Sequence, residues 1–186
     1  ELSFEMGLAH LSAGVSVADV GRVLVDRLPD DDPLRDYARE LAGPAFAGVP
    51  LAGLINGSID AVLRVPVDGA PRLFITDYKS NRLGNVGDAT HISAYAPSRL
   101  TQAMVEHHYP LQALIYGVAL HRFLRWRAPD LHSDDVIGGV AYFFLRGMTA
   151  DSAFVENGVP FGVFQWRAPR GLWAALSDAM SGRSEQ

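Results

Sequence analysis

The sequence predicts an α/β domain in which helices flank a mixed β-sheet. Helical and strand-like stretches alternate along the chain in the order β-α-α-β-β-β-α-β-β-α. The strand-like stretches 58–65 and 73–79 are separated by a short turn, which favours an antiparallel hairpin. The stretch 136–146 is apolar, as is typical of a strand buried on both faces.

The composition is that of one globular domain. The chain has 186 residues, of which 48% are hydrophobic, and no apolar run approaches the roughly 18 residues of a membrane span. There is no Cys, which excludes disulfides and thiolate metal sites. We therefore expect a cytoplasmic protein without membrane contact. The net charge of −5 does not indicate nucleic-acid binding, but carboxylates that hold a cation would offset basic residues in this sum.

Residue patterns place the individual elements. Alternating polar and apolar residues predict a strand at Glu1–Met6. Ser16 is the expected N-cap of a helix over Val17–Leu28, and Asp32-Pro33 the start of a second helix that ends near Leu41. Further strands are expected at 51–55, 58–65, 73–81, 136–146 and 163–167, and further helices at 110–127 and 169–180.

Two connections are also predicted. Asn56-Gly57 indicates a turn or bulge between neighbouring strands. The polar, irregular stretch 84–97 indicates a mobile surface loop.

The strand Leu73–Asn81 ends in a carboxylate and an ammonium two residues apart. Because side chains alternate along a strand, Asp77 and Lys79 lie on one face and Tyr78 on the other. Lys79 is the only Lys among the 16 Lys and Arg residues. A Lys ammonium is a compact charge whose pKa shifts when it is desolvated, whereas Arg is always charged. It can orient a water or a phosphate oxygen beside a metal-bound carboxylate; the alternative is a Lys that merely lies at a strand end.

A second carboxylate, Asp60, lies on the preceding strand. In a hairpin about the turn at 67–70, Asp60 falls nearly opposite Asp77, about 5 Å away on the same face. Small and apolar neighbours of Asp60 should keep water from screening its charge, so the two carboxylates repel unless one is protonated or a cation lies between them. Mg²⁺, bound by one or two carboxylates with water and substrate phosphate, fits such a pair and can act as a Lewis acid. The alternative is a pair of carboxylates that face solvent.

Gln112 and Tyr116 are four residues apart on the longest predicted helix and therefore share a face. An amide and a phenol one turn apart can hydrogen-bond a phosphate or stack against a base. The spacing by itself favours a buried Tyr beside a hydrogen-bonded Gln.

Three sequence blocks resemble one known family. They are Gly57-Ser58-Ile59-Asp60, Asp77-Tyr78-Lys79-Ser80-Asn81-Arg82-Leu83-Gly84 and His108-Tyr109-Pro110-Leu111-Gln112-Ala113-Leu114-Ile115-Tyr116. Together with 120–125 and 138–147, they resemble the C-terminal nuclease domains of the RecB family, part of the PD-(D/E)xK superfamily. The resemblance extends from Glu1 to the closing helix.

This resemblance implies a single nuclease domain over residues 1–186 with the restriction-endonuclease-like fold. It implies an exodeoxyribonuclease V type activity that cuts single strands of DNA during end resection and double-strand-break repair by recombination. Asp60, Asp77 and Lys79 are the implied catalytic residues, and Asp60, Asp77 and the Tyr78 backbone carbonyl the implied ligands of Mg²⁺. Mn²⁺ is expected to substitute and Ca²⁺ to inhibit. Gln112 and Tyr116 match the family's helix motif, and Glu1 matches an acidic position of its E-x-x-F strand.

The resemblance further implies partners and a missing ligand. DNA and RecC-like and RecD-like subunits are the expected partners, and the chain is expected to be a piece of a longer helicase–nuclease polypeptide. The family also carries a metal-binding His on a helix upstream of the E-x-x-F strand, and His10 lies in a different context. We therefore expect this segment alone to bind metal poorly and to be inactive.

A second hypothesis is a non-catalytic module that docks a partner or guides DNA, which the acidic charge and the missing His favour. Candidate contacts to phosphates or bases, near the motif strands and helix, are Arg82, Arg99, His107, His108, Arg122, Arg125, Tyr95 and Tyr109.

Overall fold

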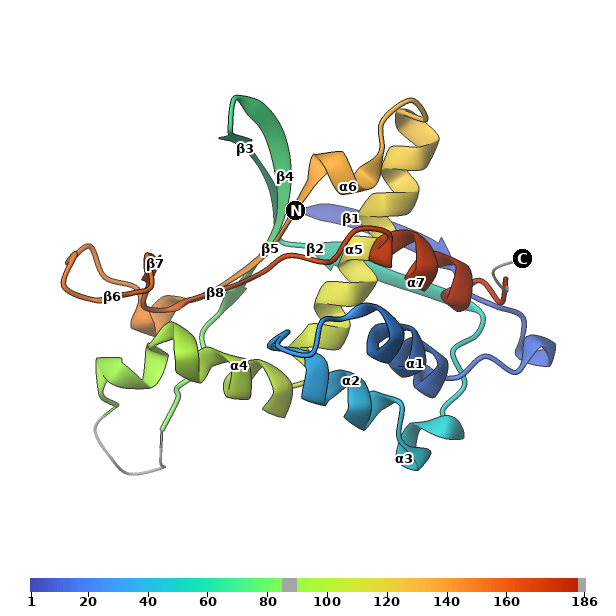
Figure 1. The fold of residues 1–186 in the computed structure, drawn as a ribbon, viewed down its shortest axis with the longest axis horizontal. Helices are drawn as coiled ribbons and strands as arrows, with labels where there is room; N and C mark the ends of the chain where they lie inside the picture. The colour runs from blue at the N-terminus through green and yellow to red at the C-terminus, as the bar shows by residue number, and fades with distance from the viewer. Residues whose placement is uncertain (85–89, 184–186) are drawn as a thin grey trace.

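The central element is a four-stranded mixed sheet with the strand order β3-β4-β5-β8. In this computed structural model, which describes residues 1–84 and 90–183, β4 (Ala70–Lys79) runs antiparallel to β3 (Ala61–Val67). It runs parallel to β5 (Ile137–Phe144), which in turn pairs antiparallel with β8 (Val163–Trp166). Helices flank this sheet (Figure 1), so the predicted α/β class with a mixed, restriction-endonuclease-like sheet is confirmed.

A separate two-stranded ribbon leads into the sheet. β1 (Leu2–Gly7) pairs antiparallel with β2 (Leu54–Ile59), and the chain passes from β2 into β3 through a bend at Asp60. The prediction of a turn or bulge at Asn56-Gly57 is wrong, because both residues pair regularly with β1. The Gly has a packing reason instead: a Cβ at Gly57 would lie 2.8 Å from the ring of Phe4.

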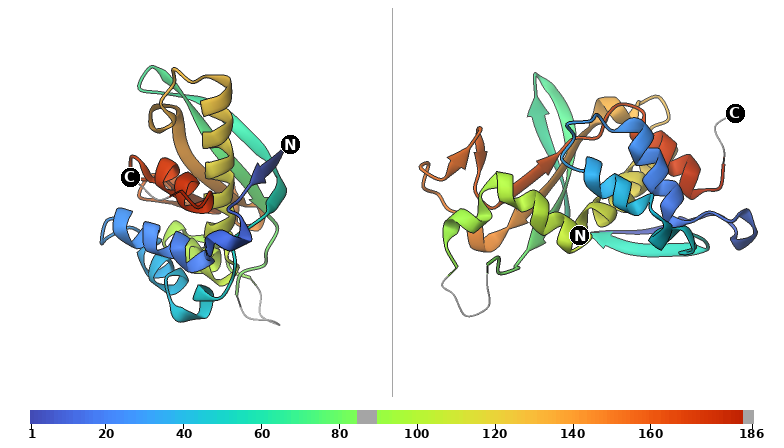
Figure 2. Two further views of the ribbon diagram at one scale, coloured as in Figure 1. Left: turned by 90° about the vertical axis from the view of Figure 1, so that its right-hand side faces the viewer. Right: turned by 60° about the horizontal axis from the view of Figure 1, so that its bottom comes forward.

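The helices are arranged in layers around the longest one, α5 (Tyr109–Arg127). α5 contacts β1, β4 and β5, α7 (Leu172–Met180) packs on α5, and α1 (Val17–Arg27) packs on α7 and on α2 (Arg35–Leu41). Figures 1 and 2 show α7 between α1 and α5. α5 is therefore buried along much of its circumference.

Local signals set two of the helix starts. Ser16 and Asp19 form a capping box, which confirms Ser16 as the N-cap of α1. α2 begins at Arg35, two residues later than Pro33, the predicted start. Asp32 accepts a hydrogen bond from the amide of Leu34 over 2.8 Å, so the carboxylate stabilises the turn that precedes the helix.

The remaining elements are short. α4 (Pro97–Glu106) was not predicted, although Leu100, Ala103 and Met104 form its buried face. Part of the predicted loop 84–97 lies outside the described residues; the described part contains η2 (Ile92–Tyr95), in which Tyr95 is buried. The others are η1 (Leu11–Ala13), α3 (Pro44–Ala47), α6 (Ser133–Val136), η3 (Leu145–Gly147), β6 (Val155–Glu156) and β7 (Val159–Pro160).

β5 is fully buried on one face only. Val140, Tyr142 and Phe144 are buried in the core, whereas Ala141 and Phe143 on the other face are half-buried. The predicted burial on both faces is therefore wrong: the second face is covered in part by Tyr78, which stacks on Phe143 and is itself exposed. None of the helices in the described part of the chain is long and apolar enough to cross a membrane.

The contact between α5 and α7 generates a stability prediction. A Cβ at Gly117 of α5 would overlap the indole of Trp173, which is buried on α7. We expect Gly117→Ala to lower the free energy of unfolding by about 1–3 kcal/mol, because a packed core resists added volume. Urea unfolding measures this change. Gly48→Ala is the control, since nothing lies within 4 Å of a Cβ there; equal loss in both variants would contradict the close packing.

Candidate active site

The C-terminal end of β4 presents the two charged residues that the alternation of a strand predicts. Asp77 Oδ2 lies 2.6 Å from Lys79 Nζ, so the two side chains share a face and form an ion pair. The ring of Tyr78 points to the opposite face, where it stacks on Phe143 with the ring centroids 5.5 Å apart. The predicted division of these residues between the two faces is confirmed.

Asp60 lies beside this pair. Asp60 directly precedes Ala61, whose partner Thr76 directly precedes Asp77, and the charge of Asp60 acts on Asp77. Asp60 Oδ2 also accepts a hydrogen bond from the backbone amide of Tyr78 over 3.0 Å. Asp60 is nevertheless exposed, which corrects the expectation that its neighbours keep water away. The reason is its place at the bend where the chain leaves one sheet and enters the next.

Asp77 is a buried carboxylate with a raised pKa. It is only 3% exposed, and its buried Oδ2 makes the ion pair with Lys79 but no hydrogen bond of good geometry to the described residues. Burial raises the pKa of Asp77 above its ordinary value of 3.8 and the charge of Asp60 adds to the rise, while Lys79 lowers it. A further cation would stabilise the ionised carboxylate, because an opposite charge favours the charged form.

Lys79 is enclosed by residues of α5 and β5. Its ammonium donates a hydrogen bond to Gln112 Oε1 over 3.0 Å, and Gln112 Nε2 in turn donates to the hydroxyl of Tyr116 over 2.8 Å. Nζ also lies 3.9 Å from the ring centroid of Tyr109 and 5.2 Å from that of Tyr142. Gln112 and Tyr116 thus share a helix face as predicted, and the pair is connected to the charged end of β4. Their contact with a phosphate or a base stays a prediction.

Tyr142 was missed at the sequence level. Its hydroxyl donates to Gln112 Oε1 over 3.2 Å, and it pairs with Asp77 in the parallel register of β4 and β5. Burial raises the pKa of both Tyr116 and Tyr142, with the charges of Asp77 and Asp60 adding to the rise. Both hydroxyls therefore stay protonated near neutral pH. The strand pattern of β5 predicts an inward Tyr142, but only the parallel register brings it to this site.

Glu1 closes another side of the site. Leu2 pairs with Ile59, and Glu1 Oε1 accepts a hydrogen bond from Ser58 Oγ over 2.8 Å. Phe4, further along the same strand, packs edge-on against Tyr116 with the ring centroids 5.8 Å apart. The E-x-x-F strand therefore places its acid on Ser58 of β2 and its aromatic ring on the helix motif.

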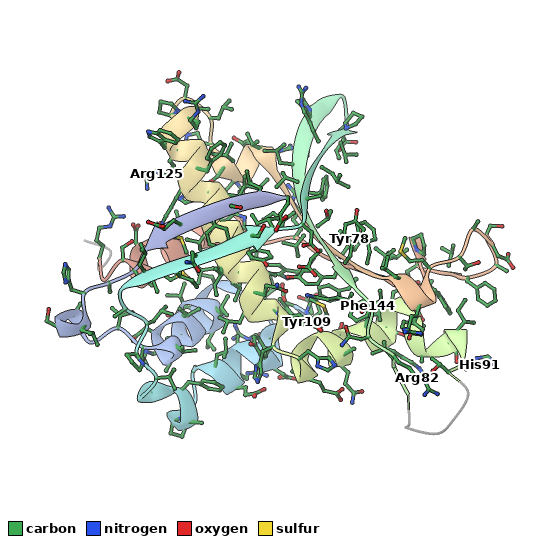
Figure 3. All side chains as sticks on the ribbon, turned by 180° about the vertical axis from the view of Figure 1, so that it is seen from behind. Tyr78, Arg82, His91, Tyr109, Arg125 and Phe144 are labelled. Carbon is green, nitrogen blue, oxygen red and sulfur yellow. The ribbon has the colours of Figure 1, made fainter. Side chains whose placement is uncertain are left out.

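Two of the expected DNA contacts are wrong. Arg122 is occupied by hydrogen bonds to the carbonyl of Gly7, to both oxygens of Ser177 and to the hydroxyl of Ser181, which tie α5 to β1 and α7. Tyr95 is 1% exposed, so its ring cannot stack on a base. Arg82, Arg99, His107, His108 and Arg125 stay predictions; Figure 3 shows Arg125 at the end of α5 remote from Tyr109.

The site offers few acidic ligands. Within residues 1–84 and 90–183, no group of three or more His, Asp or Glu side chains gathers closely enough to hold a metal ion. The oxygen donors that converge at the end of β4 are the carboxylates of Asp60 and Asp77.

The fold gives the class of this domain, and comparison with known proteins gives its family. Four mixed strands flanked by helices, with an acid and a Lys at the end of a central strand, define a restriction-endonuclease-like domain. No protein-family model matches the chain. It is 46% identical over 185 residues to RecBCD enzyme subunit RecB of Mycobacterium tuberculosis, which covers 97% of this chain and 16% of that protein.

Two further relatives carry the same name. Identity to RecBCD enzyme subunit RecB of Mycolicibacterium smegmatis is 44% over 182 residues, or 95% of this chain and 16% of that protein. Identity to the Escherichia coli subunit is 34% over 153 residues, or 82% of this chain and 12% of that protein. The chain therefore belongs to the RecB family, and it spans 16% of the length of its mycobacterial relatives.

The proximity of the two carboxylates is testable without metal. Asp60→Asn removes a like charge, so we expect the pKa of Asp77 to fall toward 3.8. Carboxyl ¹³C NMR titration of metal-free protein follows this change. Asp36→Asn, which alters an exposed carboxylate on α2, should leave Asp77 unaffected. An Asp77 pKa that ignores Asp60→Asn would mean that the two acids do not face each other.

Proposed function

We propose that the chain is a metal-dependent nuclease domain that hydrolyses phosphodiester bonds in single strands of DNA. The observation that supports this most directly is the meeting of Asp60, Asp77 and Lys79 at the end of β4, in a chain of the RecB family. A carboxylate pair beside an ammonium suits phosphodiester hydrolysis, in which negative charge builds up on the phosphate.

The donor set fits Mg²⁺. This ion binds through one or two carboxylates and keeps several waters and substrate phosphates, which matches a site with two acids. Asp60 and Asp77 would hold it, and the buried Asp77 Oδ2 has no good hydrogen bond to lose. The Tyr78 carbonyl is the third proposed ligand. A strand residue directs its N–H and C=O to the same side, and the Tyr78 N–H donates to Asp60, so the Tyr78 carbonyl also points to the side of Asp60. Mn²⁺ would substitute, and Ca²⁺ would occupy the same oxygens without supporting cleavage.

Mg²⁺, when bound, would supply Lewis acidity and lower the pKa of a coordinated water. The chain's own residues orient the reacting groups. Lys79 has three N–H donors; one donates to Gln112 and the ammonium pairs with the Asp77 carboxylate, so Lys79 can also donate to a water or a phosphate oxygen. Gln112 is held in turn by Tyr116, which fixes the amide with its oxygen toward Lys79.

The biological setting extends the proposal. The relatives are named as subunits of RecBCD, so we place the domain in DNA end resection and double-strand-break repair by recombination. RecC-like and RecD-like subunits would be its partners, and a longer helicase–nuclease chain its context. A His from outside the present residues would complete the metal ligands.

Metal binding separates this proposal from a non-catalytic docking module. We expect calorimetric titration of the chain, extended N-terminally to supply the expected His, to detect Mg²⁺ and Mn²⁺ binding. Asp77→Asn should weaken this binding by at least about 10–100-fold, which is the loss seen when a residue that only orients a metal ligand is removed. Asp36→Asn, remote from the site, serves as the control. Equal titrations of all three proteins, or no heat with any of them, would favour the docking module.

Cleavage is the direct test. Single-stranded DNA labelled at one end is incubated with Mg²⁺ and the chain, both as residues 1–186 and extended N-terminally to supply the expected His. Asp77→Ala and Lys79→Ala should lower the rate by about 10²–10³-fold, as the loss of a preorganised electrostatic group does. Arg39→Ala, a basic residue paired with Asp36 on the surface, should cleave normally. If every variant cut DNA at one rate, the assignment of the site would be refuted.

A further inference from the structure

The ammonium of Lys79 is held by an aromatic ring as well as by polar groups. Nζ lies 3.9 Å from the ring centroid of Tyr109, and the Lys79 side chain is only 12% exposed. A cation over a ring face within about 6 Å is attracted by the ring quadrupole, and the attraction grows as water is excluded. The ring of Tyr109 is therefore a significant part of the environment of this charge.

Tyr109 is itself fixed to the segment that carries Lys79. Its hydroxyl donates to Asn81 Oδ1 over 3.0 Å, and Asn81 follows Lys79 by two residues. Its ring also stacks with the rings of His107 and Tyr142, with centroid distances of 5.2 and 6.1 Å. Tyr109 is also the first residue of α5, followed by a buried Pro110. The ring thus has little freedom to move away from the ammonium.

We propose that Tyr109 is a positioning residue whose ring face holds the Lys79 ammonium against Asp77 and Gln112, so that its remaining N–H points to the reacting water or phosphate. This inference rests on the proposed nuclease function, because it assigns Tyr109 a role toward that reaction. Tyr109 acts through Lys79, and the proposed role involves no contact of its own with DNA or metal.

A neutral ring suits this task better than another acid. A further carboxylate beside Lys79 would attract the divalent cation and would accept the N–H that the reaction needs. The face of a ring stabilises the ammonium without competing for either. The compact ammonium of Lys79 lies over the ring while it pairs with Asp77 and donates to Gln112.

The single Lys provides a direct spectroscopic readout. Protein labelled with [ε-¹³C]lysine gives one side-chain signal, because the chain has no other Lys. We expect the ring current of Tyr109 to shift the ε-methylene protons of Lys79 upfield. Tyr109→Leu and Tyr109→Gln should abolish this shift, and Tyr109→Phe, which keeps the ring, should retain it. Two ring-free variants are used so that poor folding of one, seen by circular dichroism, does not decide the result.

Cleavage kinetics supply the second readout. Tyr109→Leu and Tyr109→Gln should lower kcat by about tenfold with little change in KM, because alignment of Lys79 matters in the transition state. Tyr109→Phe should restore kcat, whereas a residue with a merely structural role would show no such dependence on the ring. Phe123→Leu, an exposed aromatic on the same helix, serves as the control.

An unchanged Lys79 signal in the ring-free variants, or an unchanged kcat, would overturn the proposal. If the N-terminally extended protein without substitutions cuts no DNA, the proposed function fails, and the Lys79 signal still decides whether Tyr109 holds the ammonium.

Discussion

The ion pair between Asp77 and Lys79 is the constraint on which the site depends. A buried carboxylate is costly unless it is paired, and Asp77 is 3% exposed. The pairing with Lys79 is at 2.6 Å, yet burial still leaves the pKa of Asp77 above its ordinary value. Charges in such an unfavourable environment are common at functional sites, where their tendency to bind a further group is used.

The ion pair lies where the β1–β2 ribbon meets the four-stranded sheet. β4 lies between an antiparallel and a parallel neighbour, and its carboxyl end carries the charged residues. The bend at Asp60 joins the β1–β2 ribbon to the sheet at the same end of β4, where Asp60 accepts a hydrogen bond from the Tyr78 amide. Glu1 contacts Ser58 of the ribbon. α5 then covers this edge from the core side and brings Gln112 to Lys79.

Hydrogen bonds among aromatic and amide side chains make the site stiff. Tyr109, Tyr116 and Tyr142 each contact Gln112 or Lys79, and Asn81 joins Tyr109 to the end of β4. Buried polar groups are stable only when they are satisfied, and a network of this kind fixes one arrangement of its members. Precise alignment of Lys79 is what the proposed hydrolysis of phosphodiester bonds would need.

The sequence by itself determined what depends on local geometry. Strand alternation assigned Asp77 and Lys79 to one face, the hairpin brought Asp60 near the end of β4, and helical spacing put Gln112 and Tyr116 together. Only the tertiary structure decided the contacts between distant segments. It brought Tyr142 beside Asp77 through the parallel register, occupied Arg122 with α7, and exposed Asp60 at the bend. These outcomes depend on which elements pack together, and no short-range pattern of residues specifies that.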